Sequence, residues 1–390
     1  MRILSFIFIY LVIAVAANSQ NTFYYNVYER WTPELERLAN DYKDVRAIVS
    51  LGSCFDRASG VERDRQKAFE LFKIAADKGD FLGKYNLAHY YAKGFCSNKD
   101  YKKAVDLFEE VIKINPQMSV VYSQIANLYE QGGNGLDQDY QKAFKYYLID
   151  ADNGNKVSQF RIGDFYKKGI GVPTDLGKAK EYFLKSANQG FPLSMYEVAT
   201  YYKNEEDYAE AAKWYKASSA KNFGISTMEL AHLYYDGKGV EQSYSKAYEL
   251  YELAVKQNNQ LARFCNFLMR KMLAEGKGVP KDPDKAMTYV KESADNGFTR
   301  AQYMIGDNYN NGTNEEKNYS EAVKYFEKAL NNESVPESIK GSLYNKLSTC
   351  YRFGRGVEQD IAKVDELMQQ AAEYGDADAQ KIKEWLNIEI

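Results

Sequence analysis

Hydrophobic and polar residues follow one frame along most of this chain, and the frame repeats about every 36 residues. Each copy holds two apolar stretches with helical spacing, separated by a short loop. In the fourth copy, the first stretch contains Phe160, Ile162 and Phe165, and the second contains Tyr182 and Phe183. Apolar residues three and four apart form one face of a helix, so the pattern predicts an antiparallel helical hairpin in each copy. One hairpin cannot bury both of its faces, and its neighbours must bury them.

One alanine and one helix-capping residue mark every copy of the frame. The alanine is Ala68, Ala104, Ala143, Ala179, Ala211, Ala247, Ala286 and Ala322, with Val364 in the ninth copy. Four residues before it stand Asp64, Asp100, Asp139, Asp175, Asp207, Ser243, Asp282, Asn318 and Asp360. Asp, Asn and Ser accept hydrogen bonds from the free backbone N–H groups at a helix start. We therefore predict that the second helix of each hairpin begins at one of these caps.

The frame predicts an all-α fold: a right-handed α-solenoid superhelix of about nine helical hairpins with N- and C-terminal capping helices. We expect a signal peptide at 1–19, an N-terminal cap at 20–45, repeats at 46–376 and a C-terminal capping helix at 377–390. The expected repeats are about 47–80, 81–116, 117–155, 156–191, 192–223, 224–259, 260–298, 299–333 and 334–376.

Small residues occupy one position inside the first helix of each hairpin. Glycine there costs about 1 kcal/mol relative to alanine, so Gly163 needs a packing reason. The pattern indicates that two helices touch closely at this position, and Arg270 in repeat seven is its exception. The small residues are Gly52, Ala88, Ala126, Gly163, Ala199, Ala231, Gly306 and Ser348.

The loops and the residues that follow them resemble Sel1-like repeats. The loops at 169–172, 237–240, 276–279 and 354–357 read Gly-x-Gly-Val, and Lys-Ala pairs follow at 67–68, 178–179, 246–247 and 285–286. The resemblance covers 46–376, while repeat five is closer to a tetratricopeptide repeat. It implies an α-solenoid of the secreted or periplasmic type that acts as an adaptor for other proteins.

The first residues predict secretion. A basic start and an apolar run at 3–17 are followed by small residues, which is typical of a signal peptide cleaved after Ala16, Ala17 or Ser19. A retained membrane anchor is the alternative, although the run is short for a spanning helix. We expect the mature chain to be soluble, without stable membrane insertion. It would be periplasmic or secreted in a bacterium, and in the ER lumen or outside the cell in a eukaryote.

Neither the charge pattern nor the sequence motifs indicate catalysis, metal binding or nucleic-acid binding. The net charge is −3 and both signs are interspersed, so we expect no nucleic-acid partner. The two histidines, His89 and His232, share one repeat position, and no nucleophile, phosphate-loop or metal motif occurs. We therefore expect no enzyme, no catalytic residue, no cofactor and no metal. Among four cysteines, Cys54 and Cys96 lie in adjacent repeats and form the one plausible disulfide.

A polar residue follows the small residue of each first helix. By analogy with related solenoids, these side chains line the concave surface and contact a protein or peptide partner. The alternative is that any solvent-facing helix position is polar. This polar row consists of Ser53, His89, Asn127, Asp164, Thr200, His232, Lys271, Asp307 and Thr349.

Two junctions and one repeat depart from the frame. Extra residues lie within 258–276 and 333–354, and either junction is a candidate binding ledge or bend. Repeat eight carries glycosylation sequons at Asn311, Asn318 and Asn332, which matter if the source is eukaryotic.

The function favoured by these patterns is a non-catalytic, extracytoplasmic scaffold or adaptor that binds a protein or peptide on the solenoid surface. A structural spacer or self-associating assembly protein is the alternative. A cell-wall or β-lactam-binding enzyme is less favoured, because the chain lacks the paired cysteines claimed for such relatives. Oligomeric state and partner identity are left open.

Overall fold

The structure is a computed structural model, and it describes residues 30–312, 316–332 and 335–381. Every regular element in these ranges is helical. The chain forms two compact units, which divide between Ser194 and Met195. The expected signal peptide at 1–19 and residues 382–390 of the expected C-terminal helix lie outside the described residues, while residues 377–381 are helical.

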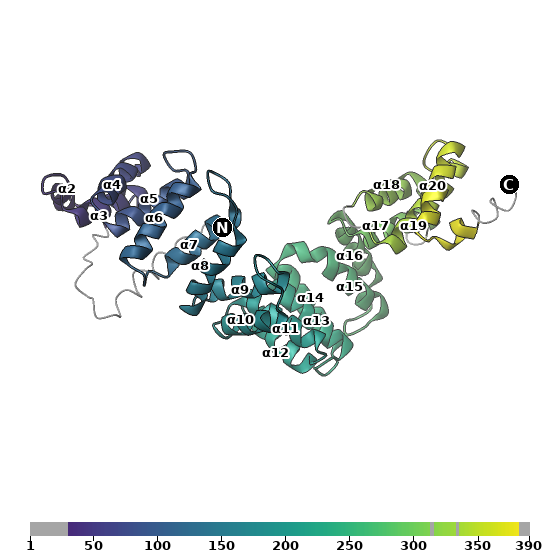
Figure 1. Cartoon of the computed structure of the whole chain (residues 1–390). Coiled ribbons are helices and arrows are strands. Elements are labelled where there is room, and N and C mark those ends of the chain that lie inside the picture. Colours follow the sequence, from purple (N-terminus) through teal and green to yellow (C-terminus); the bar gives the residue numbers. More distant parts are fainter. Residues whose placement is uncertain (1–29, 313–315, 333–334, 382–390) are drawn as a thin grey trace. The chain divides into compact units, whose positions relative to one another are not determined.

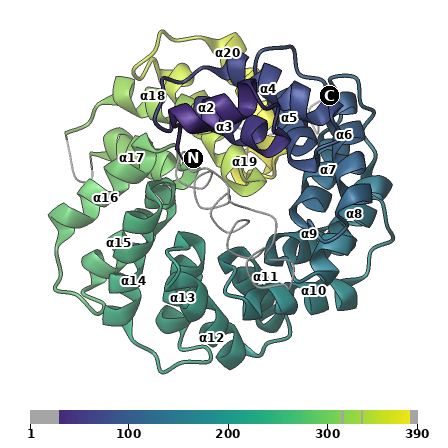
Figure 2. The same ribbon diagram turned by 90° about the vertical axis from the view of Figure 1, so that its left-hand side faces the viewer.

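The first unit contains a short N-terminal helix and four hairpins. The helices are α2 (Pro33–Asn40), α3 (Val45–Arg57), α4 (Arg65–Asp77), α5 (Phe81–Lys93), α6 (Tyr101–Ile114), α7 (Val120–Gln131), α8 (Tyr140–Asp152), α9 (Lys156–Lys168) and α10 (Leu176–Asn188) (Figure 1). From α3 to α10, odd-numbered helices form one layer and even-numbered helices the other (Figure 2).

The second unit continues the same alternation after α11 (Pro192–Asn204), which begins just before the division. Its other elements are α12 (Tyr208–Ser219), α13 (Gly224–Asp236), α14 (Tyr244–Gln257), η2 (Asn259–Leu261), α15 (Ala262–Glu275), α16 (Pro283–Asp295), α17 (Thr299–Asn311), α18 (Tyr319–Leu330), α19 (Glu337–Phe353) and α20 (Ile361–Glu373).

All nine predicted helix caps are confirmed. Each cap side chain accepts a hydrogen bond from the backbone N–H three residues later, at 2.9–3.3 Å. Asn318, for example, accepts from Glu321 at the start of α18. The cap also closes the loop before it, since the Asp175 N–H donates to the Tyr166 carbonyl of the preceding helix at 3.0 Å. Loop and helix start are therefore fixed together by two hydrogen bonds.

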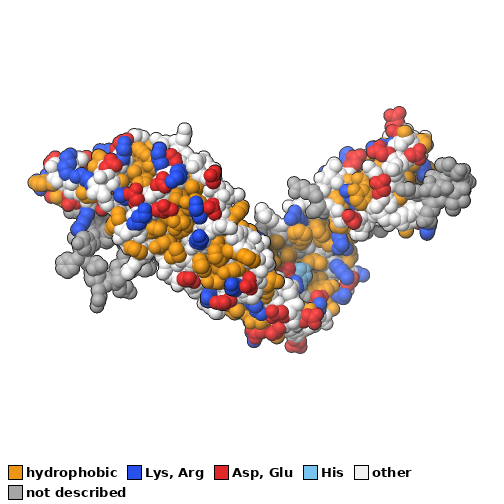
Figure 3. All heavy atoms as spheres, viewed as in Figure 1, with side chains coloured by type: hydrophobic (Ala, Val, Ile, Leu, Met, Phe, Trp, Pro, Cys, Tyr) orange, Lys and Arg blue, Asp and Glu red, His pale blue; other side chains and the backbone are white. Residues whose placement is uncertain are grey.

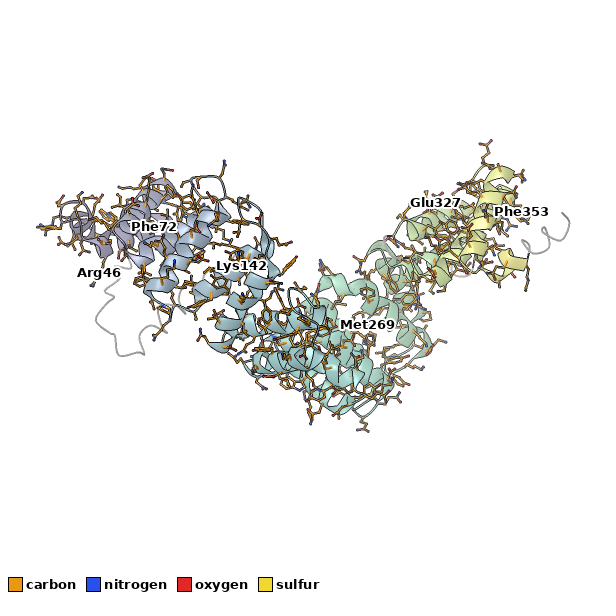
Figure 4. All side chains as sticks on the ribbon, in the orientation of Figure 1. Arg46, Phe72, Lys142, Met269, Glu327 and Phe353 are labelled. Atoms are coloured by element: carbon orange, nitrogen blue, oxygen red, sulfur yellow. The ribbon has the colours of Figure 1, made fainter. Side chains whose placement is uncertain are left out.

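The repeated alanine lies in the core of every hairpin. All eight alanines and Val364 are buried, and a large side chain follows four residues later in most repeats. Phe72 in α4 occupies that later position and is fully buried (Figure 4). The alanine leaves room for the two helices of a hairpin to approach, while the larger residue fills the space beside it.

The predicted close helix contact is confirmed where the first helix carries glycine. A Cβ atom on Gly163 would lie 2.7 Å from the Phe183 ring, and one on Gly306 would lie 2.6 Å from the Phe326 ring. In repeat seven, Val290 occupies the position of those rings in the frame. A smaller second-helix residue therefore accompanies the larger Arg270, whose guanidinium lies 4.2 Å from the Phe267 ring centroid.

The second glycine of each Gly-x-Gly loop packs against the preceding repeat. A Cβ atom on Gly278 would lie 2.3 Å from the backbone nitrogen of Ser245, at the start of α14. Gly171, Gly239 and Gly356 make the same approach to the helix starts before them. All four have positive φ, where a side chain is strained in addition. This contact joins backbone to backbone between neighbouring repeats.

The two irregular junctions are built from short helical additions. The three extra residues after Asn258 form η2, and α19 is longer than the other first helices. Pro336 is the N-cap residue of α19, where a missing backbone N–H costs no intrahelical hydrogen bond.

Substituting Gly278 by alanine tests the loop contact against a matched control, Gly297→Ala. Both glycines belong to repeat seven and have positive φ, but a Cβ atom on Gly297 meets nothing within 4 Å. We expect Gly297→Ala to lower the free energy of unfolding by about 1–2 kcal/mol, the left-handed backbone term alone. Gly278→Ala should lose at least about 2 kcal/mol more, measured by urea unfolding. Equal losses in the two variants would contradict the contact.

Candidate functional site

The polar row is spread over both units, with one residue in each first helix. It does not converge on a single cluster. The first unit carries Ser53, His89, Asn127 and Asp164, and the second carries Thr200, His232, Lys271, Asp307 and Thr349. Only Asn127 and Lys271 have exposed side chains; Asp164 is buried and the other six are partly buried.

Most members of the row already have partners within the chain. The hydroxyl groups of Ser53, Thr200 and Thr349 donate to backbone carbonyls four residues earlier in their own helices, at 2.9–3.1 Å. Asp307 pairs with Lys346 at 2.6 Å, and Asp164 pairs with Lys168 at 2.9 Å. A contact role for the row remains a prediction, and Asn127 and Lys271 are the members most open to a partner.

The two histidines are packing residues of separate units. The His89 ring lies edge-on to Tyr85 and Phe108, at centroid distances of 4.6 and 5.2 Å. Burial, aided by the charge of Lys93, lowers the pKa of His89 to about 4, so it is neutral at physiological pH. His232 stacks edge-on to Tyr251 and lies 4.0 Å from Glu229. Burial also lowers the pKa of His232.

An open cavity of about 700 Å³, lined mainly by residues with polar side chains, lies in the first unit between α7 and α9. From α7 it is lined by Ser123, Gln124, Asn127, Glu130 and Gln131. The other lining residues are Tyr147 of α8, and Asn155, Val157, Ser158 and Arg161 at the start of α9. One member of the polar row, Asn127, therefore belongs to a defined cavity, and Val157 is the only lining residue without a polar side chain.

The cavity exists because repeat three lacks an aromatic cluster found in the next repeat. In repeat four, Phe160 packs against Phe183 and Phe191, with ring centroids 5.6 and 5.5 Å apart. The equivalent residues of repeat three are Ser123, Tyr147 and Asn155. Two of the three rings are replaced by small polar side chains, which leaves space that hydroxyl and amide groups line.

Glu130 organises the charged side of the cavity. Its carboxylate is paired with Arg161 and accepts a hydrogen bond from the Tyr147 hydroxyl at 3.0 Å. Arg161 also lies 3.6 Å from Asp164. Burial lowers the pKa of the Arg161 guanidinium, and the charge of Asp164 opposes that shift. Because Glu130 and Arg161 are paired, the charged groups that line the cavity nearly cancel.

Amide side chains dominate the remaining wall. Gln131 donates to Asn127 at 2.6 Å and accepts from the Tyr101 hydroxyl at 3.2 Å. Asn155 caps α9, its side-chain oxygen accepting from the Val157 and Ser158 backbone N–H groups at 2.8 and 3.2 Å. Several groups that can both donate and accept are thus held in place by the fold.

Asp150 lies behind the two serines of this cavity and is fully buried. One of its oxygens, Oδ2, accepts a hydrogen bond from the Ser158 hydroxyl. Ser123 is near the same carboxyl, but its hydroxyl donates to the Val120 carbonyl at 2.9 Å. Oδ1 is left without a hydrogen-bond partner among the described residues. Burial raises the pKa of Asp150, and the neighbouring hydroxyl groups of Ser158 and Ser123 oppose the rise.

Most other repeats place Ser or Ala where Asp150 stands. Ser186 and Ser218 hold that position in repeats four and five, and each pairs with a serine eight residues later, Ser194 or Ser226, at 2.7 and 2.8 Å. At the junction of repeats three and four the second serine, Ser158, is kept, and Asp150 replaces the first serine by a carboxylate. A buried carboxyl oxygen without a partner destabilises a fold, so Asp150 is unfavourable for packing alone.

Replacing Asp150 by serine should therefore stabilise the protein, by about 1–3 kcal/mol at neutral pH. An unfolded Asp loses its proton near pH 4, whereas the folded pKa is raised. The folded wild type thus binds more protons than the unfolded chain above pH 4, and its stability falls as the pH rises through the raised pKa. The gain from Asp150→Ser should be larger at pH 8 than at pH 4 in urea unfolding.

The matched control for that measurement is the exposed neighbour Asp152→Ser, which should change stability little at either pH. A wild-type protein that is more stable than Asp150→Ser at pH 8 would show that the carboxyl is fully paired.

The cysteines and sequons have defined places in the fold. All four cysteines are free thiols in the structure; Cys54 is buried and Cys96 is exposed, so the candidate disulfide between them is not present in it. Asn311 and Asn318 are exposed. The Asn332 side-chain nitrogen donates to Thr299 and Gln302, both at 2.8 Å, and is partly buried. Glycosylation at these three positions remains a prediction.

No three His, Cys, Asp or Glu side chains gather into a metal-binding group in the described part of the chain. Among residues 30–312, 316–332 and 335–381, no helix is both long enough and apolar enough to span a bilayer.

Nine segments match one family, the Sel1 repeat. They are residues 45–80, 82–110, 122–155, 156–191, 192–223, 225–259, 267–298, 299–334 and 343–376. The chain belongs to the Sel1 repeat family. Repeat five is among the matched segments, so its tetratricopeptide-like loop is a variation within the Sel1 array. Sel1 repeat proteins mediate protein–protein interactions.

Solved structures support the Sel1 repeat fold of this chain. The protective antigen c5321 of uropathogenic Escherichia coli, described as displaying an SLR fold, is 24% identical with a TM-score of 0.68, covering 89% of this chain and 80% of that protein. A Sel1 repeat protein from Oxalobacter formigenes is 23% identical with a TM-score of 0.64, covering 81% of this chain and 89% of that one. At these identities the likeness concerns the fold alone.

One curated relative matches over most of the Sel1 array. The chitin synthase regulator SKT5 of Saccharomyces cerevisiae is 25% identical over 299 residues, which is 75% of this chain and 38% of that protein. The chain spans between 16% and 38% of the length of the curated relatives it matches.

Proposed function

We propose that this Sel1 repeat chain is a non-catalytic, extracytoplasmic scaffold that binds a protein or peptide on the surface of its first helices. The observation that carries the proposal is the array itself: within each unit, successive hairpins present their first helices with a polar residue at one repeat position, and the identity of that residue varies along the chain. A repeated frame with variable residues offers an extended surface for recognition, which is how solenoids bind partners.

Surface charge supports a protein partner over nucleic acid. On the face of the first unit visible in Figure 3, Lys and Arg side chains are interspersed with Asp and Glu, and hydrophobic side chains lie between them. Many basic residues are also paired within the chain, as Lys102 is with Asp106 and Lys185 with Glu181. A nucleic-acid surface needs a continuous basic stripe instead.

The extracytoplasmic location rests on the N-terminal residues of the sequence. The apolar run at 3–17 with a basic start supports secretion, and a fractionation blot with N-terminal sequencing tests it. We expect a mature N-terminus following Ala16, Ala17 or Ser19 in an extracytoplasmic fraction. An intact N-terminus in a cytoplasmic fraction would contradict this location.

The partner surface is tested by reversing the exposed charge of the polar row. Lys271→Glu on α15 should reduce capture of the native partner at least about tenfold, since it places a like charge or removes a hydrogen bond at the contact. Lys256→Glu is the matched control, because Lys256 is exposed on α14, a second helix of the same unit. Asp164 and Asp307 are poorer choices, since reversing either one breaks an ion pair within the chain.

Capture is measured by quantitative affinity purification from the native extract. Equal recovery of the same proteins by both variants and the wild type would remove the first-helix surface of this unit as the binding face. Self-capture of the tagged chain, with no other protein, would favour the alternative of a self-associating assembly.

A further inference from the structure

We propose that the cavity between α7 and α9 is a binding site for a neutral, polyhydroxylated ligand of one to three sugar units. This goes beyond the proposed scaffold function, because the site is complete within the first unit and requires no protein partner. Its volume of about 700 Å³ lies within the range of small-molecule sites.

The chemistry of the wall matches hydroxyl groups. A sugar hydroxyl both donates and accepts a hydrogen bond, and so do the side chains of Gln124, Asn127 and Gln131 and the hydroxyl of Ser123. The Glu130–Arg161 pair offers acceptors and donors side by side without net charge. A phosphate or carboxylate ligand would face Glu130 and, through the serines, Asp150, and no unpaired cation in the wall would compensate it.

Aromatic residues fill the corresponding space in the repeats on either side. In repeat two, the corresponding space holds Tyr85 against Phe108, with ring centroids 5.9 Å apart. In repeat four it holds Phe160 between Phe183 and Phe191. The polar lining is therefore confined to one interval between neighbouring repeats. A compact ligand fits such an interval, whereas an extended peptide would need matching polar positions in the neighbouring repeats.

The buried carboxyl of Asp150 is a second observation that points to a ligand. Its Oδ1 has no partner among the described residues, and the two serines beside it both line the cavity. A ligand hydroxyl at the Ser123 side allows the Ser123 proton to turn from the Val120 carbonyl to Oδ1. The carboxyl would then be fully paired only when the cavity is occupied, so binding would relieve the packing defect of the free protein.

The full-length purified chain is tested with maltotriose, cellotriose and the trimer of N-acetylglucosamine, by saturation-transfer NMR and calorimetry. Tetraglycine with blocked ends is the peptide probe of similar size. We expect at least one saccharide to bind with a Kd below about 1 mM. Asn127→Ala should weaken it roughly tenfold, the effect of one lost hydrogen bond with its partner left unpaired. Lys271→Ala, at the same repeat position outside the cavity, should leave the Kd unchanged.

Two further variants separate binding from folding. Ser123→Phe introduces into the cavity the aromatic side chain that Phe160 provides at the equivalent position of repeat four. This variant should abolish saccharide binding. Asp150→Ser should weaken binding while raising the melting temperature, an outcome that a merely unfolded variant cannot produce. Absence of saccharide binding up to about 10 mM, binding that survives Ser123→Phe, or binding of tetraglycine in place of the saccharides would each overturn the proposal.

The sugar could belong to a glycan on a partner protein or be a free saccharide. The two sources are distinguished by repeating the affinity capture of partner proteins from an extract treated to remove glycans. Capture that depends on both the glycans and an open cavity assigns the ligand to a glycan of a partner protein. Binding of the free trisaccharides without any glycan-dependent capture assigns it to a free saccharide. Lys271→Glu affects only the scaffold surface, so failure of either proposal leaves the other intact.

Discussion

Backbone contact between neighbouring repeats is the constraint on which the remaining structure depends. At the second glycine of a Gly-x-Gly loop, the chain lies against the start of the preceding second helix, with too little space for a side chain. The capped helix start that it meets is itself fixed by a hydrogen bond that a backbone N–H donates to the cap side chain, as Lys246 does to Ser243. Loop, cap and helix start are therefore held together at Gly171, Gly239, Gly278 and Gly356, and this contact sets the spacing between the hairpins that it joins.

Repeat two shows how far this joint tolerates change. Cys96 stands where other loops have their second glycine, and it keeps the positive φ of 62°. Its exposed side chain and the Arg65–Phe95 stacking, with 4.1 Å between the guanidinium carbon and the ring centroid, take the place of the close backbone contact. The conformation is kept while the contact is replaced, which indicates that the turn itself is the stricter requirement.

The repeating part of this structure could be predicted from sequence because its causes are local. A cap residue acts three residues away, the buried alanine acts within one hairpin, and a small residue such as Gly163 reports directly on the ring it faces. The sequence also shows that Arg270 replaces the small residue of the first helix in repeat seven. The reason becomes clear only from the second helix, where Val290 stands in place of the ring that faces this position in most other repeats. These local rules can be recognised in the sequence because the same pattern occurs in nine copies.

The candidate site was less predictable, because it depends on what is missing from the frame. The polar row was found by position, yet burial and partners within the chain leave only Asn127 and Lys271 exposed. The cavity arises where Ser123, Tyr147 and Asn155, from different parts of repeat three, jointly fail to fill one space. No single residue carries that signal. Asp150 came nearest to doing so, as a carboxylate at a position that holds Ser or Ala in most other repeats.

A solenoid is suited to this kind of local departure, because each repeat packs only on its neighbours. In a domain with a single core, an unpaired buried carboxyl and an open cavity would disturb the packing of the whole interior. Here the aromatic clusters around Phe108 and Phe183 lie on either side of repeat three and keep the ordinary packing of the array. The destabilisation that we predict at Asp150 would be confined to one repeat interval, so the chain can hold a polar, incompletely paired site within an otherwise regular array.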